Sequence, residues 1–256
     1  MREFSNFVMS SSIGRSYLFS TGQAGFIIKS VSGQLLAVDL YLSDCVERTE
    51  GHIGYKRMLP KILSTDELIF NVVIATHPHL DHFDIDSVPG LMSNGRTQLF
   101  CSVDCEKLVK QTQMEYFSQQ ITYVEPSENY QSGDFNIHFV NCDHGTGAPD
   151  AVGVVIEVDG KIIYVAGDTC LRLDRVDEVK NIGKIDVLIS PINGAYGNLT
   201  EKECVKFSKA LRPNLTIPCH YGMFASHGGN PGIFYEEMKK TDLNYTILTQ
   251  GERIIL

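Results

Sequence analysis

The sequence predicts an α/β fold, an αββα sandwich in which two mixed β-sheets pack face to face and helices flank their outer faces. Three observations carry this prediction: segments with strand-like composition recur in both halves of the chain, two of them form hairpins, and segments with helical periodicity lie between them. Sheets and amphipathic helices each have an apolar face to bury. Two packed sheets with helices outside bury all of these faces.

Two segments are predicted as β-hairpins, residues 25–40 and 152–168, and the second carries Asp159-Gly160 at its turn. Asp-Gly is a strong hairpin signal because tight hairpin turns require positive φ at their central positions. Further segments rich in β-branched and aromatic residues are predicted as single strands. They are 16–20, 70–75, 98–102, 121–125, 135–141, 185–191, 215–219 and 245–250.

Helical periodicity appears at residues 105–117, 199–211 and 232–240. The second of these begins near Thr200 and Glu203, which approximate a capping box. The stretch 44–66 is polar and irregular, and it is predicted to be a surface excursion near the mouth of a site.

Composition excludes several classes of function. The formal charge of -9 and the pI near 5.3 oppose binding to nucleic acid or to anionic membranes, because both need clustered Lys and Arg. No secretory leader and no apolar run of membrane-spanning length is recognisable. Seven cysteines without a CxxC pair favour reduced thiols, so the expected location is the cytoplasm. No linker or repeat divides the chain, and we expect one domain over 1–256.

The strongest chemical signal follows the predicted strand 70–75, where His77, His79, Asp81 and His82 lie within six positions. His77 and His79 alternate in an extended segment, so their imidazoles point the same way, while Asp81 and His82 lie on the turn beyond. A polar loop of locally hydrogen-bonded histidines is the alternative. Three histidines and an aspartate at a strand end favour a metal site, and their placement suggests two adjacent ions.

Three further residues follow the C-terminal ends of predicted strands: His144, Asp168 and His220. Taken singly, each histidine is as readily an ordinary polar residue, and Asp168 fits a turn or an N-cap. Their shared placement indicates that they converge on the cluster that begins at His77.

With these residues the sequence resembles the metallo-β-lactamase superfamily, whose HxHxDH signature is present in full from His77 to His82. The resemblance implies that fold and a pair of ligand sets: His77, His79 and His144 for one ion, Asp81, His82 and His220 for the other, with Asp168 bridging both. The segments HGTGAPDAVGVVIEVDGKIIYVAGDT and RPNLTIPCHYG are most similar to the L-ascorbate-6-phosphate lactonase-like branch.

The expected activity is therefore hydrolysis. Two divalent ions, Zn²⁺ or Mn²⁺ with Fe²⁺ also compatible, would activate a bridging hydroxide that attacks a small anionic ester, lactone or sugar-phosphate derivative. A phosphodiesterase of the same superfamily is the alternative enzyme, and a metal-binding sensor or scaffold without turnover is the alternative from another class. The expected partner is a small-molecule substrate, and a homo-oligomer stays open.

Other polar residues have a functional and a structural interpretation. Asp81 is predicted to orient the hydroxide as well as to bind metal. Tyr221 points its phenol at a developing oxyanion or is simply packed, and His227 binds substrate from a Gly-rich loop or is a surface histidine. Asn193 and Asp150 are either contacts of the site or turn-forming residues.

Overall fold

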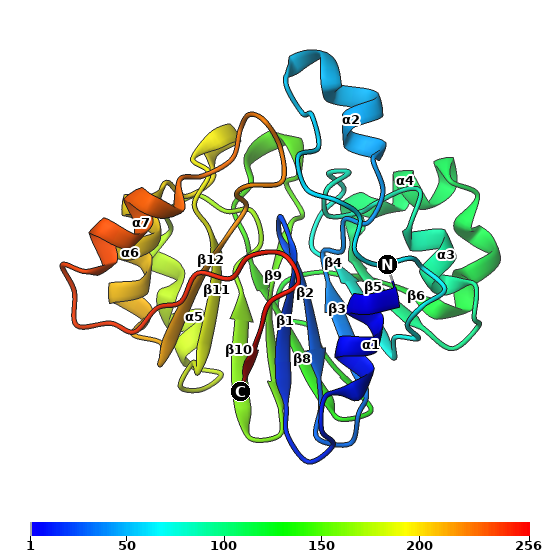
Figure 1. The fold of residues 1–256 in the computed structure, drawn as a ribbon, viewed down its shortest axis with the longest axis horizontal. Coiled ribbons are helices and arrows are strands. Elements are labelled where there is room, and N and C mark those ends of the chain that lie inside the picture. Colours follow the sequence, from blue (N-terminus) through cyan, green and yellow to red (C-terminus); the bar gives the residue numbers. More distant parts are fainter. Residues whose placement is uncertain (1) are drawn as a thin grey trace.

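The computed structural model describes residues 2–256. Two mixed β-sheets pack face to face, and helices cover the outer face of each (Figure 1). This arrangement confirms the predicted αββα sandwich.

The first sheet has the strand order β13-β1-β2-β3-β4-β5-β6. Pairing is antiparallel from β13 to β3 and parallel from β3 to β6. The strands in chain order are β1 (Tyr17–Gly22), β2 (Gly25–Lys29), β3 (Leu35–Val38), β4 (Val72–Ala75), β5 (Gln98–Ser102), β6 (Ile121–Val124) and β13 (Arg253–Ile255).

The second sheet has the strand order β12-β11-β10-β9-β8-β7. Here β10, β11 and β12 are parallel, whereas β7, β8, β9 and β10 pair antiparallel. The strands are β7 (Asn129–Ser132), β8 (Phe135–Asn141), β9 (Val152–Val158), β10 (Lys161–Val165), β11 (Val187–Pro191) and β12 (Leu215–Cys219).

The core between the sheets follows from the two-residue period of the strands. Leu18 and Ile28 of the first sheet belong to one buried cluster with Phe139 and Ile156 of the second. Successive residues of a strand point to opposite faces, so every second apolar residue enters this layer. Each fully buried side chain of this size contributes about 1.5–3 kcal/mol relative to an exposed one.

The intervening apolar residues face outward and are covered by helices. Phe19 of β1 packs edge-to-face against Phe4, with ring centroids 6.3 Å apart, and Tyr164 of β10 meets Phe207 at 6.2 Å. The helices are α1 (Arg2–Ser10), α2 (Cys45–Glu50), α3 (Val88–Met92), α4 (Glu106–Gln111), α5 (Val176–Lys180), α6 (Glu201–Leu211) and α7 (Pro231–Met238). Short 3₁₀ turns are η1 (Gly51–Ile53), η2 (Val103–Cys105), η3 (Met114–Gln120), η4 (Gly145–Gly147), η5 (Leu173–Arg175) and η6 (Ala195–Gly197).

Two local predictions from the sequence are confirmed by the backbone. The β9–β10 turn has φ of 52° at Asp159 and 74° at Gly160, as a tight hairpin turn requires. At the start of α6, the Thr200 side chain accepts from the Glu203 N–H while the Glu203 carboxylate accepts from the Thr200 N–H, which is a capping box.

The predicted strand 245–250 is wrong. Its only ladder contact among the described residues is an isolated bridge from Tyr245 to Thr216, on β12. The segment then leaves the second sheet and reaches the edge of the first, where Gly251 donates to Ser20 and β13 pairs with β1. A chain that crosses between two sheets cannot stay in the ladder of either.

The predicted helix 105–117 is shorter than expected. α4 ends at Gln111, and Gln113 adopts a left-handed φ of 55° before η3. The helices α1, α2, α3 and α5 and the strands β7 and β13 were not predicted. α1 is amphipathic, but its nine residues carry no strong start or stop signal, and it is held by contacts with the first sheet.

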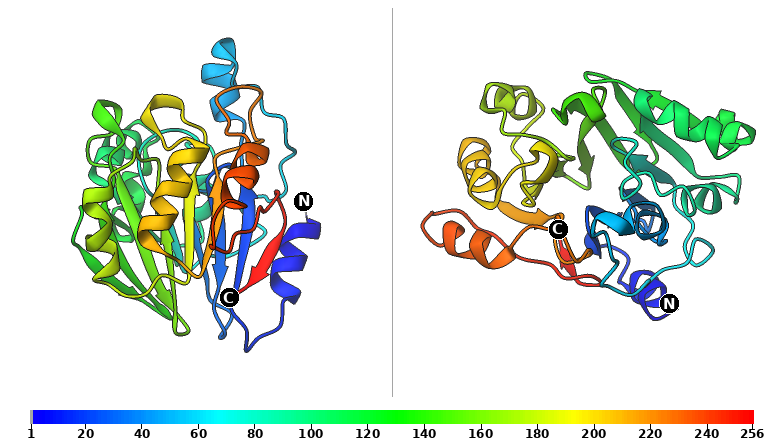
Figure 2. Two further views of the ribbon diagram at one scale, coloured as in Figure 1. Left: turned by 90° about the vertical axis from the view of Figure 1, so that its left-hand side faces the viewer. Right: turned by 90° about the horizontal axis from the view of Figure 1, so that it is seen from above.

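The surface excursion predicted at 44–66 is confirmed, although it contains α2 and η1. α2 stands above the body of the sandwich (Figure 2). In residues 2–256 none of the helices has the length and the apolar character needed to span a membrane.

Candidate metal centre

Strand ends position the candidate residues at one edge of the sandwich. Parallel strands present their carboxyl ends together, and residues placed there meet. His77 follows β4, His144 follows β8, Asp168 follows β10 and His220 follows β12. The structure brings all seven sequence-predicted ligands into three overlapping groups whose ligand atoms lie within 4.8 Å of one another.

The first group joins His77, His79 and His144. The Nδ1 of His79 lies 3.0 Å from the Nε2 of His77 and 3.0 Å from the Nε2 of His144. The three rings meet nearly at right angles, with His79 at 80° to His77 and 78° to His144. Three imidazole nitrogens that converge from different directions form the donor set that a divalent transition metal prefers.

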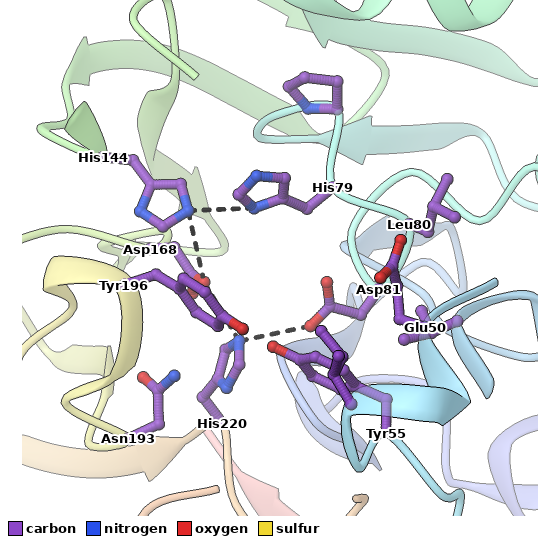
Figure 3. A pocket seen from close by; sticks show the side chains of 13 residues that line it. Glu50, Tyr55, His79, Leu80, Asp81, His144, Asp168, Asn193, Tyr196 and His220 are labelled. Carbon is purple, nitrogen blue, oxygen red and sulfur yellow. Dashed lines mark hydrogen bonds and ion pairs between the residues drawn. The ribbon is translucent and has the colours of Figure 1, made fainter. Parts of the chain in front are cut away.

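The second group joins Asp81, His82 and His220. The Oδ2 of Asp81 lies 3.3 Å from the Nε2 of His220 and 3.7 Å from the Nε2 of His82. The Oδ2 of Asp168 lies between the two groups, 3.1 Å from His220, 3.5 Å from His82 and 3.9 Å from the Nε2 of His144 (Figure 3).

Two observations show that the residues fit bound cations. The Nε2 of His82 is buried without a hydrogen-bond partner among the described residues, yet it faces Asp81 and Asp168. Burial opposes charge on His220, but Asp168 and Asp81 outweigh it and raise the pKa of His220 to about 9. Two buried carboxylates thus demand nearby positive charge, which a metal ion supplies.

The first group has the opposite electrostatics. Burial lowers the pKa of His77 well below its usual value, and burial is also the main cause that lowers the pKa of His144 to about 4. Both imidazoles are therefore neutral near pH 7. A neutral imidazole has a free lone pair, which is the state that binds metal.

Asp39, which the sequence analysis did not single out, contacts His82 on the side of its ring that faces away from the cluster. Its Oδ2 lies 2.8 Å from the Nδ1 of His82, and its two oxygens accept from the N–H and hydroxyl of Thr76. The Thr76 hydroxyl oxygen in turn lies 3.1 Å from the Nδ1 of His77. These contacts leave the Nε2 atoms of His82 and His77 directed at the site. Asp39 follows β3 directly, so the strand-end rule that identified Asp168 also applies to it.

The sequence analysis also did not single out two amide side chains that contact the cluster. The Nε2 of Gln23 donates to the Oδ2 of Asp81 at 2.9 Å, and the Nδ2 of Asn198 donates to the Oδ2 of Asp168 at 2.7 Å. Neither residue carries a sequence signal, because an amide in a loop is usually a turn residue.

The structure places His227 in an aromatic stack beside the cluster. Its ring lies 4.7 Å from the ring of Tyr55 at an interplanar angle of 12°, and 5.5 Å from the ring of Tyr196 at 25°. The Nδ1 of His227 is 2.7 Å from the hydroxyl of Ser226. Tyr55 and Tyr196 line the pocket over the cluster, and their hydroxyls point toward one another (Figure 3).

Tyr221 follows His220 but lines a different pocket, with Gln23 and Leu248. Its hydroxyl donates to the Leu248 carbonyl at 2.6 Å, which favours the packing interpretation. Asn193 lines the pocket over the cluster and accepts from Asn198. Asp150 is exposed, and its backbone N–H donates to Asp104.

The pocket over the cluster has a volume of about 370 Å³, the size of a small-molecule site. Ligand atoms at its floor come from His79, Asp81, His144, Asp168 and His220. Its walls come from loops and from α2 and η1, so the segment 44–66 borders the mouth of the site as predicted.

The fold and this cluster define a metal-dependent hydrolase of the metallo-β-lactamase class, with histidine and aspartate groups able to bind metal. Residues 17–220 match the family model described as Beta-lactamase superfamily domain. The chain belongs to this family, as the HxHxDH signature had indicated.

Relatives agree with this assignment. The chain is 25% identical over 230 residues to a UPF0173 metal-dependent hydrolase of Anaeromyxobacter dehalogenans. The alignment covers 85% of this chain and 79% of the relative. Two solved structures share the fold. A metallo hydrolase of Ignicoccus hospitalis has a TM-score of 0.71 at 21% identity and covers 94% and 98% of the two chains. An isothiocyanate hydrolase from Delia radicum gut bacteria has a TM-score of 0.73 at 18% identity and covers 93% and 98%.

Proposed function

We propose that this protein is a two-metal hydrolase that cleaves a small ester or lactone, in the manner of the lactonase-like branch. The observation that carries the proposal is the position of Asp168. Its Oδ2 lies between a group of three imidazoles and a group of two imidazoles and a carboxylate. A carboxylate between two complete donor sets is suited to bridge a pair of cations.

In this proposal the two donor sets have separate roles: His77, His79 and His144 would hold one ion, Asp81, His82 and His220 would hold the other, and Asp168 would contact both. Zn²⁺, Mn²⁺ and Fe²⁺ all suit mixed imidazole and carboxylate ligands. When bound, the ions bring the pKa of water near neutrality and polarise the scissile carbonyl.

The chain's own residues orient the reacting groups. Gln23 donates to the Oδ2 of Asp81, which fixes the carboxylate beside His220, where it can hold the proton of the attacking water. Asn198 fixes Asp168 in the same way. The Tyr55–His227–Tyr196 stack borders the substrate, so His227 acts through the two tyrosines, and Tyr221 has a packing role.

The experiment has two parts: elemental analysis of protein purified without added metal, and a substrate panel with Zn²⁺ or Mn²⁺ loaded. The panel contains an aryl ester, a lactone, a bis-aryl phosphate and, because one fold neighbour is named an isothiocyanate hydrolase, an isothiocyanate. We expect metal-stimulated hydrolysis of the ester or the lactone. Turnover of the phosphodiester alone would replace the proposal with a phosphodiesterase. No turnover at full metal loading would favour a sensor or scaffold.

A matched pair of variants tests the ligand assignment. His82→Ala removes one donor of the second set, so metal content is expected to fall from about two ions to about one, with at least about a hundredfold loss of turnover. His138→Ala is the control, because His138 lies on β8 and contacts Asn129 and Glu157. Equal metal content in the two variants would contradict the assignment.

A further inference from the structure

The walls of the pocket over the metal centre are apolar and aromatic. Val46 lies on α2, Ile53 on η1 and Leu80 in the loop after β4, and all three line the pocket beside Tyr55 and Tyr196. Ile53 is 47% exposed and Tyr196 is 60% exposed. Large apolar side chains left open to solvent at the rim of a small pocket are suited to cover an apolar part of a ligand.

Apart from the candidate metal-ligand histidines, the same pocket has no basic side chain. Among residues 2–256, neither a lysine nor an arginine lines it, whereas Glu50, Asp81 and Asp168 do. Glu50 ends α2 and is exposed. Phosphate and carboxylate groups are recognised in proteins chiefly by Arg, Lys or converging backbone N–H groups. Beyond the candidate metal ligands, Glu50 is the charged side chain among the lining residues, and its carboxylate repels an anion.

The lysine and arginine side chains of the segment 44–66 already have partners: Arg57 donates to the carbonyls of Ser43 and Leu59, and Lys61 forms an ion pair with Asp44. The guanidinium of Arg48 donates to both oxygens of Asp86, at 2.8 and 3.0 Å. Lys56 forms an ion pair with Glu47. An anionic substrate would have to break one of these pairs to gain a basic partner in this segment.

The aromatic stack closes one side of the pocket. The ring of His227 stacks against the rings of both Tyr55, in the loop after η1, and Tyr196, in η6. Burial and a hydrogen bond with Tyr196 raise the pKa of Tyr55, so the Tyr55 phenol stays neutral. The wall beside the reacting centre thus presents uncharged ring surfaces to the ligand (Figure 3).

We propose that this pocket selects an uncharged substrate whose arm, away from the scissile bond, is apolar. The inference rests on the proposed ester or lactone hydrolysis and names its substrate class. It departs from the anionic substrate expected from the sequence, because the sequence displays the metal ligands but not the charge of the walls around them.

The test compares three para-nitrophenyl esters with six-carbon acyl chains on the metal-loaded protein: hexanoate, adipate monoester and 6-aminohexanoate. The first ends in a methyl group, the second in a carboxylate and the third in an ammonium. We expect kcat/KM for the hexanoate to exceed that for each charged ester by at least about tenfold, since apolar burial is lost and, for the adipate, Glu50 repels. Equal values, or a preference for either charged ester, would overturn the proposal.

A charge reversal at Glu50 tests whether this pocket causes the preference for hexanoate over adipate. Glu50→Lys is expected to narrow the preference for hexanoate over adipate by about five- to tenfold, and Glu50→Gln by less. Glu115→Lys is the control, because Glu115 is an exposed residue of η3 and makes the same change of net charge. An equal effect of Glu50→Lys and Glu115→Lys would assign the preference to net charge and not to this pocket.

A binding measurement separates this inference from the proposed function. Hexanamide and adipamic acid carry the same two arms without a labile ester, and ligand-observed NMR reports their binding. If no ester is hydrolysed, the proposed function fails. Tighter binding of hexanamide would still support the substrate class, whereas tighter binding of adipamic acid would overturn it.

Discussion

Asp39 contacts the Nδ1 of His82 and thereby fixes the orientation of that ring. It is fully buried and accepts from Thr76 twice, so its carboxylate is held rigidly against the Nδ1 of His82. Its backbone adopts a left-handed φ of 50°, a conformation that costs free energy in any residue other than glycine. His220 and Gln23 share this feature, with φ of 65° and 55°. Backbone strain at three residues of one site is the pattern expected where geometry serves function.

Substitution of this carboxylate tests its role. Asp39→Asn keeps the size of the side chain but weakens the acceptor for His82, so metal affinity is expected to fall about 10–100-fold. The measurement is a metal titration in competition with a chromogenic chelator. Asp134→Asn is the control, because Asp134 accepts from Ser30 and Ser32 and is not a residue of the metal cluster. Unchanged affinity in Asp39→Asn would contradict the orienting role.

At the scale of elements, the first helix is tied to the first sheet by one buried cation. The Nζ of Lys29, on β2, donates to the carbonyls of Val8 and Ser11 at 2.9 Å and of Met9 at 3.1 Å. These carbonyls lie at the C-terminal end of α1, where helix carbonyls lack partners and the dipole favours a positive charge. Burial lowers the pKa of Lys29, and the three acceptors offset that cost.

Lys29→Met is expected to destabilise the protein by about 2–4 kcal/mol, because it leaves three carbonyls without their charged donor. Urea unfolding measures the loss, and hydrogen exchange over residues 2–10 should increase first. Lys107→Met on α4 is the control, since Lys107 is exposed. If the two variants unfold at the same urea concentration, Lys29 does not anchor the helix.

At the scale of the whole molecule, the metal centre joins the two sheets. His77 follows a strand of the first sheet, whereas His144, Asp168 and His220 follow strands of the second. Bound metal would therefore link the two sheets at one edge, in addition to the buried core between them. A ligand that binds only the folded state raises the free energy of unfolding. Because residues of both sheets would bind the metal, it would stabilise both sheets.

Metal removal tests this coupling. At Zn²⁺ about a hundredfold above its Kd, binding contributes about 2.7 kcal/mol, which raises Tm by about 5–10 °C relative to chelator-treated protein. Differential scanning calorimetry measures the shift, and one transition is expected for a single domain. Ca²⁺ is the control, because it prefers oxygen ligands and should leave Tm unchanged. Equal Tm with Zn²⁺ and with chelator would contradict the coupling.

Much of the fold could be predicted because strand periodicity and turn chemistry are local. The alternation of Leu18 with Phe19 assigns each to a face before any partner is known. The segment 245–250 has strand composition but lies where the chain changes sheets, which composition does not reveal. α1 escaped prediction for a similar reason, since Lys29 stabilises it from a distant strand.

For the site too, some features could be predicted from the sequence and others could not. Histidine and aspartate side chains prefer metals wherever they lie, so the sequence alone determined the layered fold and the residues proposed as donors, from His77 to His220. Only the tertiary structure decided that Asp168 lies between the two groups, that Asp39 and Gln23 contact His82 and Asp81, and that no lysine or arginine of residues 2–256 lines the pocket. The physical reason is that ligand preference and hydrophobic period belong to single residues and strands, whereas convergence and pocket charge arise when two sheets pack.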